Sequence, residues 1–171
     1  MGETANDEKL TFVTNGPADT KEFARELAAA CRPDDVIGLC GTLGSGKTTL
    51  VKGLARGLSV DETRQVISPT FMLMRSYPGR LDLHHFDAYR LSGGDEMDAI
   101  GAEEVFASGG VSVVEWADHV EDCLPPDHFV LRITVEGAER RRFELSAMGQ
   151  QSRSRLQEFG RHTEKWQISP A

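Results

Sequence analysis

The sequence predicts an α/β fold with buried strands at its centre. Two short apolar runs, Val36–Cys40 and Val111–Val114, have the length and composition of strands that are buried on both faces, as in parallel sheets. A glycine-rich turn and a helical pattern follow the first run directly. Two further pairs of extended segments indicate antiparallel hairpins. We therefore expect a parallel core sheet with hairpin strands beside it.

The elements before the first buried run are a strand and a helix. Residues Leu10–Thr14 predict a short strand, and Ala18–Cys31 predict a helix that Asp19 or Thr20 caps and that Pro33 stops. Its apolar residues recur at helical spacing: Phe23, Leu27 and Ala30.

A second helix and a first hairpin follow the glycine-rich turn. The helix covers Leu50–Gly57, with Gly57 as its stop. The hairpin joins Phe71–Tyr77 to Arg80–Phe86 through a Pro-Gly pair, which is typical of a β-turn.

The second half of the chain predicts two more helices and a second hairpin between them. One helix begins at Ser92 or Asp95. Its inward residues are expected to be Met97, Ile100 and Val105. The hairpin pairs Val130–Val135 with Arg142–Leu145, and Ser152–His162 form a terminal helix with a thin apolar face.

The length of the chain predicts a single domain, and its acidic composition argues against a primary nucleic-acid-binding protein. The chain has 171 residues, 19 Lys and Arg against 27 Asp and Glu, and a net charge of −8. Such an acidic chain lacks a broad surface for neutralising phosphates. We expect a disordered N-terminus at 1–9, a domain at 10–149, and a C-terminal tail or short helix at 150–171.

The sequence also predicts a cytoplasmic protein without a membrane contact. No stretch approaches the roughly 18 apolar residues that span a bilayer, and the acidic N-terminus is not a signal peptide. The three cysteines fit neither a disulfide framework nor a zinc site.

The glycine-rich turn carries the chemistry. Residues Gly41 to Thr48 match the pattern G-x-x-x-x-G-K-[ST] in full, between a predicted strand and a predicted helix, which is the context that defines a phosphate-binding P-loop. Glycines allow successive amide N–H groups to face an anion, and the helix adds its positive end. Lys47 reaches the phosphates and Thr48 offers a hydroxyl to Mg²⁺. The expected nucleotide contacts are Thr42, Leu43, Gly44, Ser45, Gly46, Lys47, Thr48 and Thr49.

Two acidic residues are candidates for catalysis and metal binding beside this loop. Glu115 closes the run Val111–Val114, so its carboxylate emerges at the carboxyl end of a strand, where ligands bind in open α/β sheets. It would orient the attacking water or a metal-bound water. Asp87 ends the first hairpin and would bind the metal from another direction. The alternative for both is a solvated surface role.

Ser68-Pro69-Thr70 resembles a switch segment that senses the γ-phosphate. Two hydroxyls flank a rigid proline between the P-loop helix and the hairpin. The alternative is a plain turn before a strand.

ATP is the expected nucleotide. A guanine-specific site would need an Asn-Lys-x-Asp motif, but both asparagines, Asn6 and Asn15, precede the P-loop and neither is followed by lysine. Two classes remain open. A small-molecule kinase would need an acceptor pocket and an arginine-bearing lid, for which Arg140–Arg142 is the available cluster. A nucleotide-gated module that serves a partner fits the acidic composition and the switch-like segment better.

Taken together, five motifs resemble the TsaE (formerly YjeE) family, the ATPases of bacterial tRNA threonylcarbamoyladenosine biosynthesis. The resemblance runs from about Thr11 to Gly149. Its elements are Gly41–Thr49, Ser-Pro-Thr-Phe at 68–71, His-Phe-Asp-Ala-Tyr-Arg-Leu at 85–91, Glu96 to Phe106 with Gly101, and Val-Glu-Trp at 114–116.

The resemblance implies a P-loop NTPase fold of three α/β/α layers and a weak ATPase that uses ATP and Mg²⁺. It implies stimulation by the TsaB–TsaD heterodimer, in which TsaD modifies the adenosine 3′ of the anticodon in tRNAs that read codons beginning with A. Contact with tRNA would then be indirect.

By residue, the family implies catalytic roles for Lys47, Glu115 and Asp87, with Thr48, Glu115 and Asp87 around the metal. Ser68 and Thr70 would be switch hydroxyls.

The resemblance also implies a nucleotide-base site, and this chain departs from the family pattern nearby. The base would lie between the loop at 14–19 and Arg141. The chain has Thr42, Ser45 and Ala88 where the family usually has Asp, Ala and Leu, so it lacks an acidic side chain beside the phosphates. The tail from Gln150 onward lies outside the resemblance.

Overall fold

The computed structural model describes residues 8–169, in which eight strands form one sheet. The strands are β1 Lys9–Asn15, β2 Val36–Cys40, β3 Met74–Tyr77, β4 Leu83–Asp87, β5 Val111–Glu115, β6 Phe129–Val135, β7 Arg140–Ala147 and β8 Gln167–Ile168. The helices are α1 Pro17–Ala28, α2 Lys47–Gly57, α3 Asp95–Ala99, α4 Ala102–Phe106 and α5 Gln150–His162.

The sheet has a parallel centre and antiparallel margins, as predicted. Its order is β3-β4-β5-β2-β6-β7-β1-β8. Strands β4, β5, β2 and β6 are parallel neighbours, while β3, β7, β1 and β8 pair antiparallel. Asp87 lies in register with Glu115, and Glu115 with Leu39. The carboxyl ends of β4, β5 and β2 therefore meet at one edge, where the P-loop begins.

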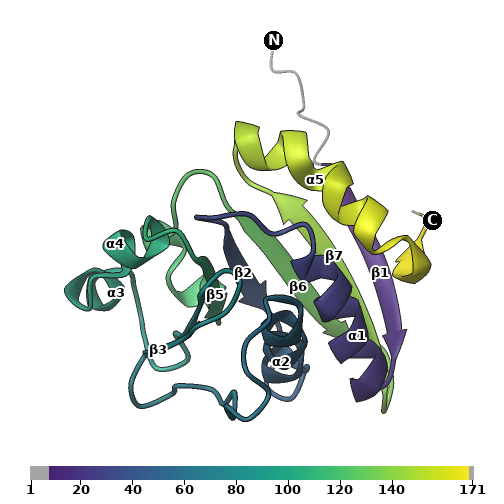
Figure 1. The fold of residues 1–171 in the computed structure, drawn as a ribbon, viewed down its shortest axis with the longest axis horizontal. Coiled ribbons are helices and arrows are strands. Elements are labelled where there is room, and N and C mark those ends of the chain that lie inside the picture. Colours follow the sequence, from purple (N-terminus) through teal and green to yellow (C-terminus); the bar gives the residue numbers. More distant parts are fainter. Residues whose placement is uncertain (1–7, 170–171) are drawn as a thin grey trace.

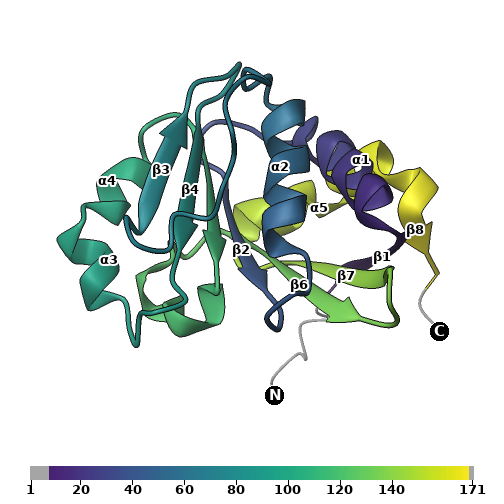
Figure 2. The same ribbon diagram turned by 90° about the horizontal axis from the view of Figure 1, so that it is seen from below.

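Helices cover both faces of the sheet, which confirms the three-layer α/β/α fold (Figures 1 and 2). The larger core packs apolar side chains of α1, α2 and α5 against the sheet, with Phe23, Leu54 and Phe159 fully buried. The smaller core lies on the other face, under α3 and α4, and includes Met97 and Phe106. None of the helices between residues 8 and 169 has the length and apolar character to cross a membrane.

Two glycines of α2 allow it to pack closely against α1. A Cβ on Gly53 would lie 2.3 Å from the carbonyl oxygen of Lys21, and one on Gly57 would lie 2.4 Å from Cβ of Ala28. Gly57 is predicted to stop the helix, and it is the last helical residue, with Leu58 as the C-cap. Its missing side chain also serves the contact between the helices.

The N-terminal helix differs from its prediction at both ends. It ends at Ala28 rather than Cys31, and Gly16 is its N-cap without a side-chain cap. Pro17 begins the helix in the position where a missing N–H costs least. The expected caps point elsewhere: Asp19 accepts a hydrogen bond from the amide of Asn15, and Thr20 pairs with Thr14 through their hydroxyls.

The single helix expected after residue 92 is two short helices. Gly101 lies between α3 and α4 with φ +76°, a left-handed conformation that glycine adopts without strain. Met97 is buried as predicted, but Ile100 is 38% exposed because the chain turns there.

The first hairpin is shorter than its prediction. Its strands begin at Met74 and Leu83, and Phe71 lies outside the sheet with 84% of its surface exposed.

The two ends of the chain bear on the expected domain boundaries. Residues 1–7 of the expected disordered segment lie outside the described residues, and Lys9 already belongs to β1. At the other end, Leu156 and Phe159 of α5 are fully buried, and β8 pairs with β1. The segment from 150 therefore adds a helix and an edge strand to the same core.

Candidate functional site

A cavity of about 470 Å³ opens where the parallel strands end. The P-loop forms one wall, and the ends of β4 and β5 form the opposite one. The lining residues include eleven predicted site residues and two that were not predicted: Leu43, Gly44, Ser45, Gly46, Lys47, Thr48, Thr49, Ser68, Thr70, Asp87 and Glu115, with Tyr89 and Trp116.

The loop backbone has the conformation that requires glycine. Gly44 and Gly46 have φ of +76° and +105°, and Gly46 is the N-cap of α2. A Cβ on Gly41 would lie 2.6 Å from the hydroxyl oxygen of Ser45. The loop can therefore turn its amides and the positive end of α2 toward one anion.

Lys47 lies inside this loop. Its ammonium donates to the carbonyl oxygens of Gly41 at 2.7 Å and Thr42 at 2.9 Å. It also lies 3.8 Å from the ring centroid of Trp116, within the range of a cation–π interaction. Burial lowers the pKa of Lys47, and the Glu115 carboxylate opposes that shift. The loop thus holds a partly desolvated positive charge beside the cavity.

Glu115 connects the P-loop helix to β4. The hydroxyl of Thr48 donates to Glu115 Oε1 at 3.0 Å, and Nε2 of His85 lies 2.7 Å from the same oxygen. Glu115 is 3% exposed and His85 is fully buried. This carboxylate is held in place rather than solvated, so a free surface role does not describe it.

Asp87 holds the segment that was predicted to act as a switch. Its Oδ2 accepts hydrogen bonds from the hydroxyls of Ser68 and Thr70, the latter at 3.2 Å, and its Oδ1 accepts one from the amide of Tyr89 at 2.9 Å. Both hydroxyls line the cavity. The segment therefore reaches the site through one buried carboxylate.

The donor set fits Mg²⁺ as a companion of bound phosphates. Thr48, Glu115 and Asp87 offer hydroxyl and carboxylate oxygens, which a hard cation prefers. No group of three or more His, Cys, Asp or Glu within residues 8–169 is arranged to hold a metal ion unaided. Phosphate and water oxygens would have to complete the shell, as is usual for Mg²⁺ in nucleotide sites.

Arg141 lies beside the P-loop but outside the main cavity. Its Nε donates to the carbonyl oxygen of Ser45 at 2.9 Å. A smaller hollow of about 160 Å³ separates it from the start of α1, where Gly16, Pro17 and Thr20 form the wall. The structure thus brings Arg141 and the loop at 14–19 to one hollow beside the P-loop.

Of the predicted nucleotide contacts from Thr42 to Thr49, Thr42 is the one that lies apart from the main cavity. It does not line the main cavity but a separate hollow behind the loop, together with Cys40, Asp118 and Arg132. Its backbone carbonyl, rather than its side chain, contacts Lys47.

Sequence reasoning missed His85 and Tyr89 as members of this neighbourhood. Trp116, which follows Glu115, contacts Tyr89 with ring centroids 5.0 Å apart. Trp116 also has φ +58°, which is unusual for a bulky residue. Sequence spacing gives no sign of these contacts, although His85 and Tyr89 flank Asp87 in the strand-end motif.

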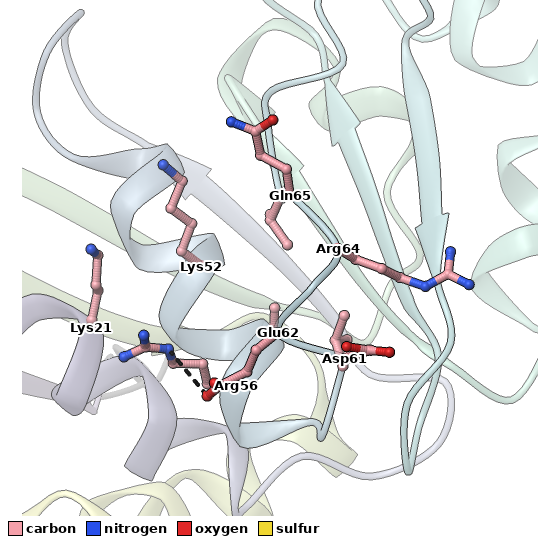
Figure 3. Close-up of a pocket in the computed structure, with 10 residues that line it drawn as sticks. Lys21, Lys52, Arg56, Asp61, Glu62, Arg64 and Gln65 are labelled. Carbon is pink, nitrogen blue, oxygen red and sulfur yellow. Dashed lines mark ion pairs between the residues drawn. The ribbon is translucent and has the colours of Figure 1, made fainter.

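A further hollow, of about 210 Å³, lies away from these residues (Figure 3). It lies between α1, α2 and the segment after α2, and Lys21, Lys52 and Arg56 line one side of it. Arg56 pairs with Glu62 at 4.0 Å. None of the predicted site residues lines this hollow.

Comparison with known proteins identifies the family. A sequence profile described as "Threonylcarbamoyl adenosine biosynthesis protein TsaE" matches residues 14–143. Three relatives carry the name tRNA threonylcarbamoyladenosine biosynthesis protein TsaE. The protein of Bacillus subtilis (strain 168) is 39% identical over 155 residues, which are 90% of this chain and 96% of that protein. The protein of Treponema pallidum (strain Nichols) is 40% identical over 116 residues, 68% of this chain and 84% of that protein. The protein of Streptomyces coelicolor is 45% identical over 117 residues, 66% of this chain and 77% of that protein.

The fold agrees with the sequence match. The crystal structure of Bacillus subtilis YdiB is similar with a TM-score of 0.78 and 35% identity, over 91% of this chain and 96% of that one. The family profile spans the P-loop, both strand-end acids and Arg141. The chain belongs to the TsaE family.

Proposed function

We propose that this chain binds ATP with Mg²⁺ and hydrolyses it as an accessory subunit of tRNA threonylcarbamoyladenosine biosynthesis. The observation that supports the proposal most is the single cavity in which the P-loop lysine faces two buried strand-end carboxylates. Membership of the TsaE family supplies the pathway.

In the proposed hydrolysis, each side chain at the cavity has a separate role. Lys47 would exchange its two carbonyl acceptors for the β- and γ-phosphate oxygens, and the amides from Gly44 to Thr48 would surround the same phosphates. Glu115 would orient a water for attack on the γ-phosphorus. The new P–O bond forms as the bond to the bridging oxygen of ADP breaks. Mg²⁺, when bound, neutralises phosphate charge beside Thr48, Glu115 and Asp87.

The switch segment would report the state of the nucleotide. Ser68 and Thr70 donate to Asp87, which lines the same cavity as Lys47. A γ-phosphate or its metal competes for that carboxylate and those hydroxyls. Loss of the γ-phosphate would return them to the contacts seen in the structure.

The partner of this cycle would be the TsaB–TsaD heterodimer in the cytoplasm, with tRNA contacted only through it. The chain's net charge of −8 supports a protein partner over direct capture of RNA. The relatives' shared name supports the pathway but not the particular partners.

A small-molecule kinase was the alternative, and its expected arginine lid finds no support in the structure. Arg140 and Arg142 both pair with Glu136, and Arg141 is bonded to the P-loop carbonyl of Ser45. These contacts hold the cluster as part of the hairpin instead of leaving it free to close over an acceptor.

One experiment separates the two functions. The chain is incubated with γ-labelled ATP and Mg²⁺, either with a metabolite pool or with the TsaB–TsaD heterodimer. The proposal predicts free labelled phosphate that increases with the heterodimer. Label on a small acceptor would instead establish a kinase.

A further inference from the structure

His85 is a buried polar residue that does not itself line the cavity. It lies on β4 in register with Val113 of β5 and has no exposed surface. Its Nε2 is 2.7 Å from Glu115 Oε1. Burial of an imidazole in the centre of a sheet is unfavourable unless its polar atoms are used.

The contacts of the ring decide which of its nitrogens carries hydrogen. Among residues 8–169, Nδ1 has no hydrogen-bond partner. A hydrogen there would be a buried donor without an acceptor, whereas a bare lone pair is the smaller penalty. The ring therefore carries its hydrogen on Nε2 and donates it to Glu115.

This bond acts together with the one from Thr48. Thr48 donates to the same oxygen, Oε1, at 3.0 Å, so two donors hold one oxygen of the carboxylate. The other oxygen, Oε2, has no hydrogen-bond partner among the described residues. Two directed bonds fix the rotation of the carboxylate and leave one oxygen for a water.

We propose that His85 is a positioning residue: it holds the Glu115 carboxylate in the orientation needed to direct the attacking water. The proposal rests on the ATPase function proposed above. Supporting groups of this kind typically change activity by about 10- to 100-fold when they are removed. The loss should appear in turnover, because no contact of His85 reaches the P-loop itself.

The neighbouring histidine offers a matched control. His84 points to the opposite face of β4, where its ring pairs with the hydroxyls of Ser76 at 2.7 Å and Ser108 at 3.0 Å. It does not line the nucleotide cavity. The same substitution at the two positions compares loss of the Glu115 contact with loss of a buried imidazole in general.

The test measures phosphate release and nucleotide affinity with the full chain and the TsaB–TsaD heterodimer. His85→Phe is expected to lower turnover at saturating ATP and Mg²⁺ by about 10- to 100-fold while the nucleotide Kd stays unchanged. His85→Gln, which keeps an N–H donor of similar reach, should recover most of that loss. His84→Phe should turn over like the wild type.

Three results would overturn the proposal. One is a folded His85→Phe variant with wild-type turnover, and another is an equal loss in His84→Phe. The third is a Gln variant as impaired as the Phe variant. If His85→Phe does not fold, Gln is compared with the shorter Asn, which cannot reach Glu115, and equal turnover of the two would contradict the assignment. A wild-type chain that binds no ATP would instead remove the proposed function as a whole.

Discussion

Replacing Lys47 with alanine removes a positive charge that the P-loop holds beside the cavity. In the structure the ammonium donates to the carbonyls of Gly41 and Thr42 at 2.7 and 2.9 Å, so it must leave two good hydrogen bonds to reach phosphates. A hydrogen bond to a charged group contributes about 1.5–3 kcal/mol, against about 1 kcal/mol for each neutral-acceptor bond that is given up.

Two phosphate contacts contribute about 3–6 kcal/mol and two carbonyl contacts cost about 2 kcal/mol, which leaves a net of about 1–4 kcal/mol. This net corresponds to roughly 5- to 900-fold weaker nucleotide binding. The assay is titration of a fluorescent, non-hydrolysable ATP analogue with Mg²⁺. Lys52→Ala is the control, because Lys52 lies on the same helix with an exposed side chain that does not line the cavity. Binding by Lys47→Ala that matches both the control and the wild type would refute this account of the lysine.

Three further changes test other parts of the structure. Glu115→Ala should keep nucleotide binding and lose hydrolysis, measured by phosphate release at saturating ATP; unchanged turnover would assign Glu115 a structural role. Gly53→Ala should lower the free energy of unfolding by about 1–3 kcal/mol, because its Cβ would lie 2.3 Å from a backbone oxygen of α1, whereas Gly137→Ala, with its nearest atom at 3.9 Å, should not. Equal urea midpoints for these two variants would contradict the packing argument. Burial lowers the pKa of His84, so the unfolded chain binds that proton more tightly. Stability should therefore be complete above about pH 6.5 and decrease as the pH falls through the folded pKa, and His84→Gln should flatten that slope in urea unfolding at several pH values.

The elements of the fold that the sequence predicts correctly are those that depend on local sequence patterns. The P-loop has a fixed spacing, and the apolar runs beside it place Glu115 and Asp87 at strand ends, so the meeting of these residues at one sheet edge followed from the parallel order. Their roles in catalysis remain predictions, since geometry alone does not test them.

What the sequence could not predict depends on contacts between distant segments. The cap of α1 is a glycine followed by proline because Asp19 and Thr20 find partners on the preceding strand instead. Gly101 breaks a helical pattern by a backbone turn that apolar spacing does not reveal. Helix α5 has few apolar residues, so the sequence predicts less burial than the structure shows. Its Phe159 packs against Phe129 of β6 with ring centroids 4.7 Å apart.

In the site, too, local patterns predict some residues, while contacts between distant segments determine the others. Thr42 belongs to the P-loop pattern, yet it lines a separate hollow and not the main cavity. His85 looks like one of two adjacent strand histidines, and its partner Glu115 is thirty residues away. Only the parallel pairing of β4 with β5 brings them together.

Calorimetric titration of the full wild-type chain with a non-hydrolysable ATP analogue and Mg²⁺ tests the central claim most directly. The account predicts saturable binding of one nucleotide per chain that depends on Lys47. A folded chain that gives no heat with the adenine nucleotide and the metal would contradict it.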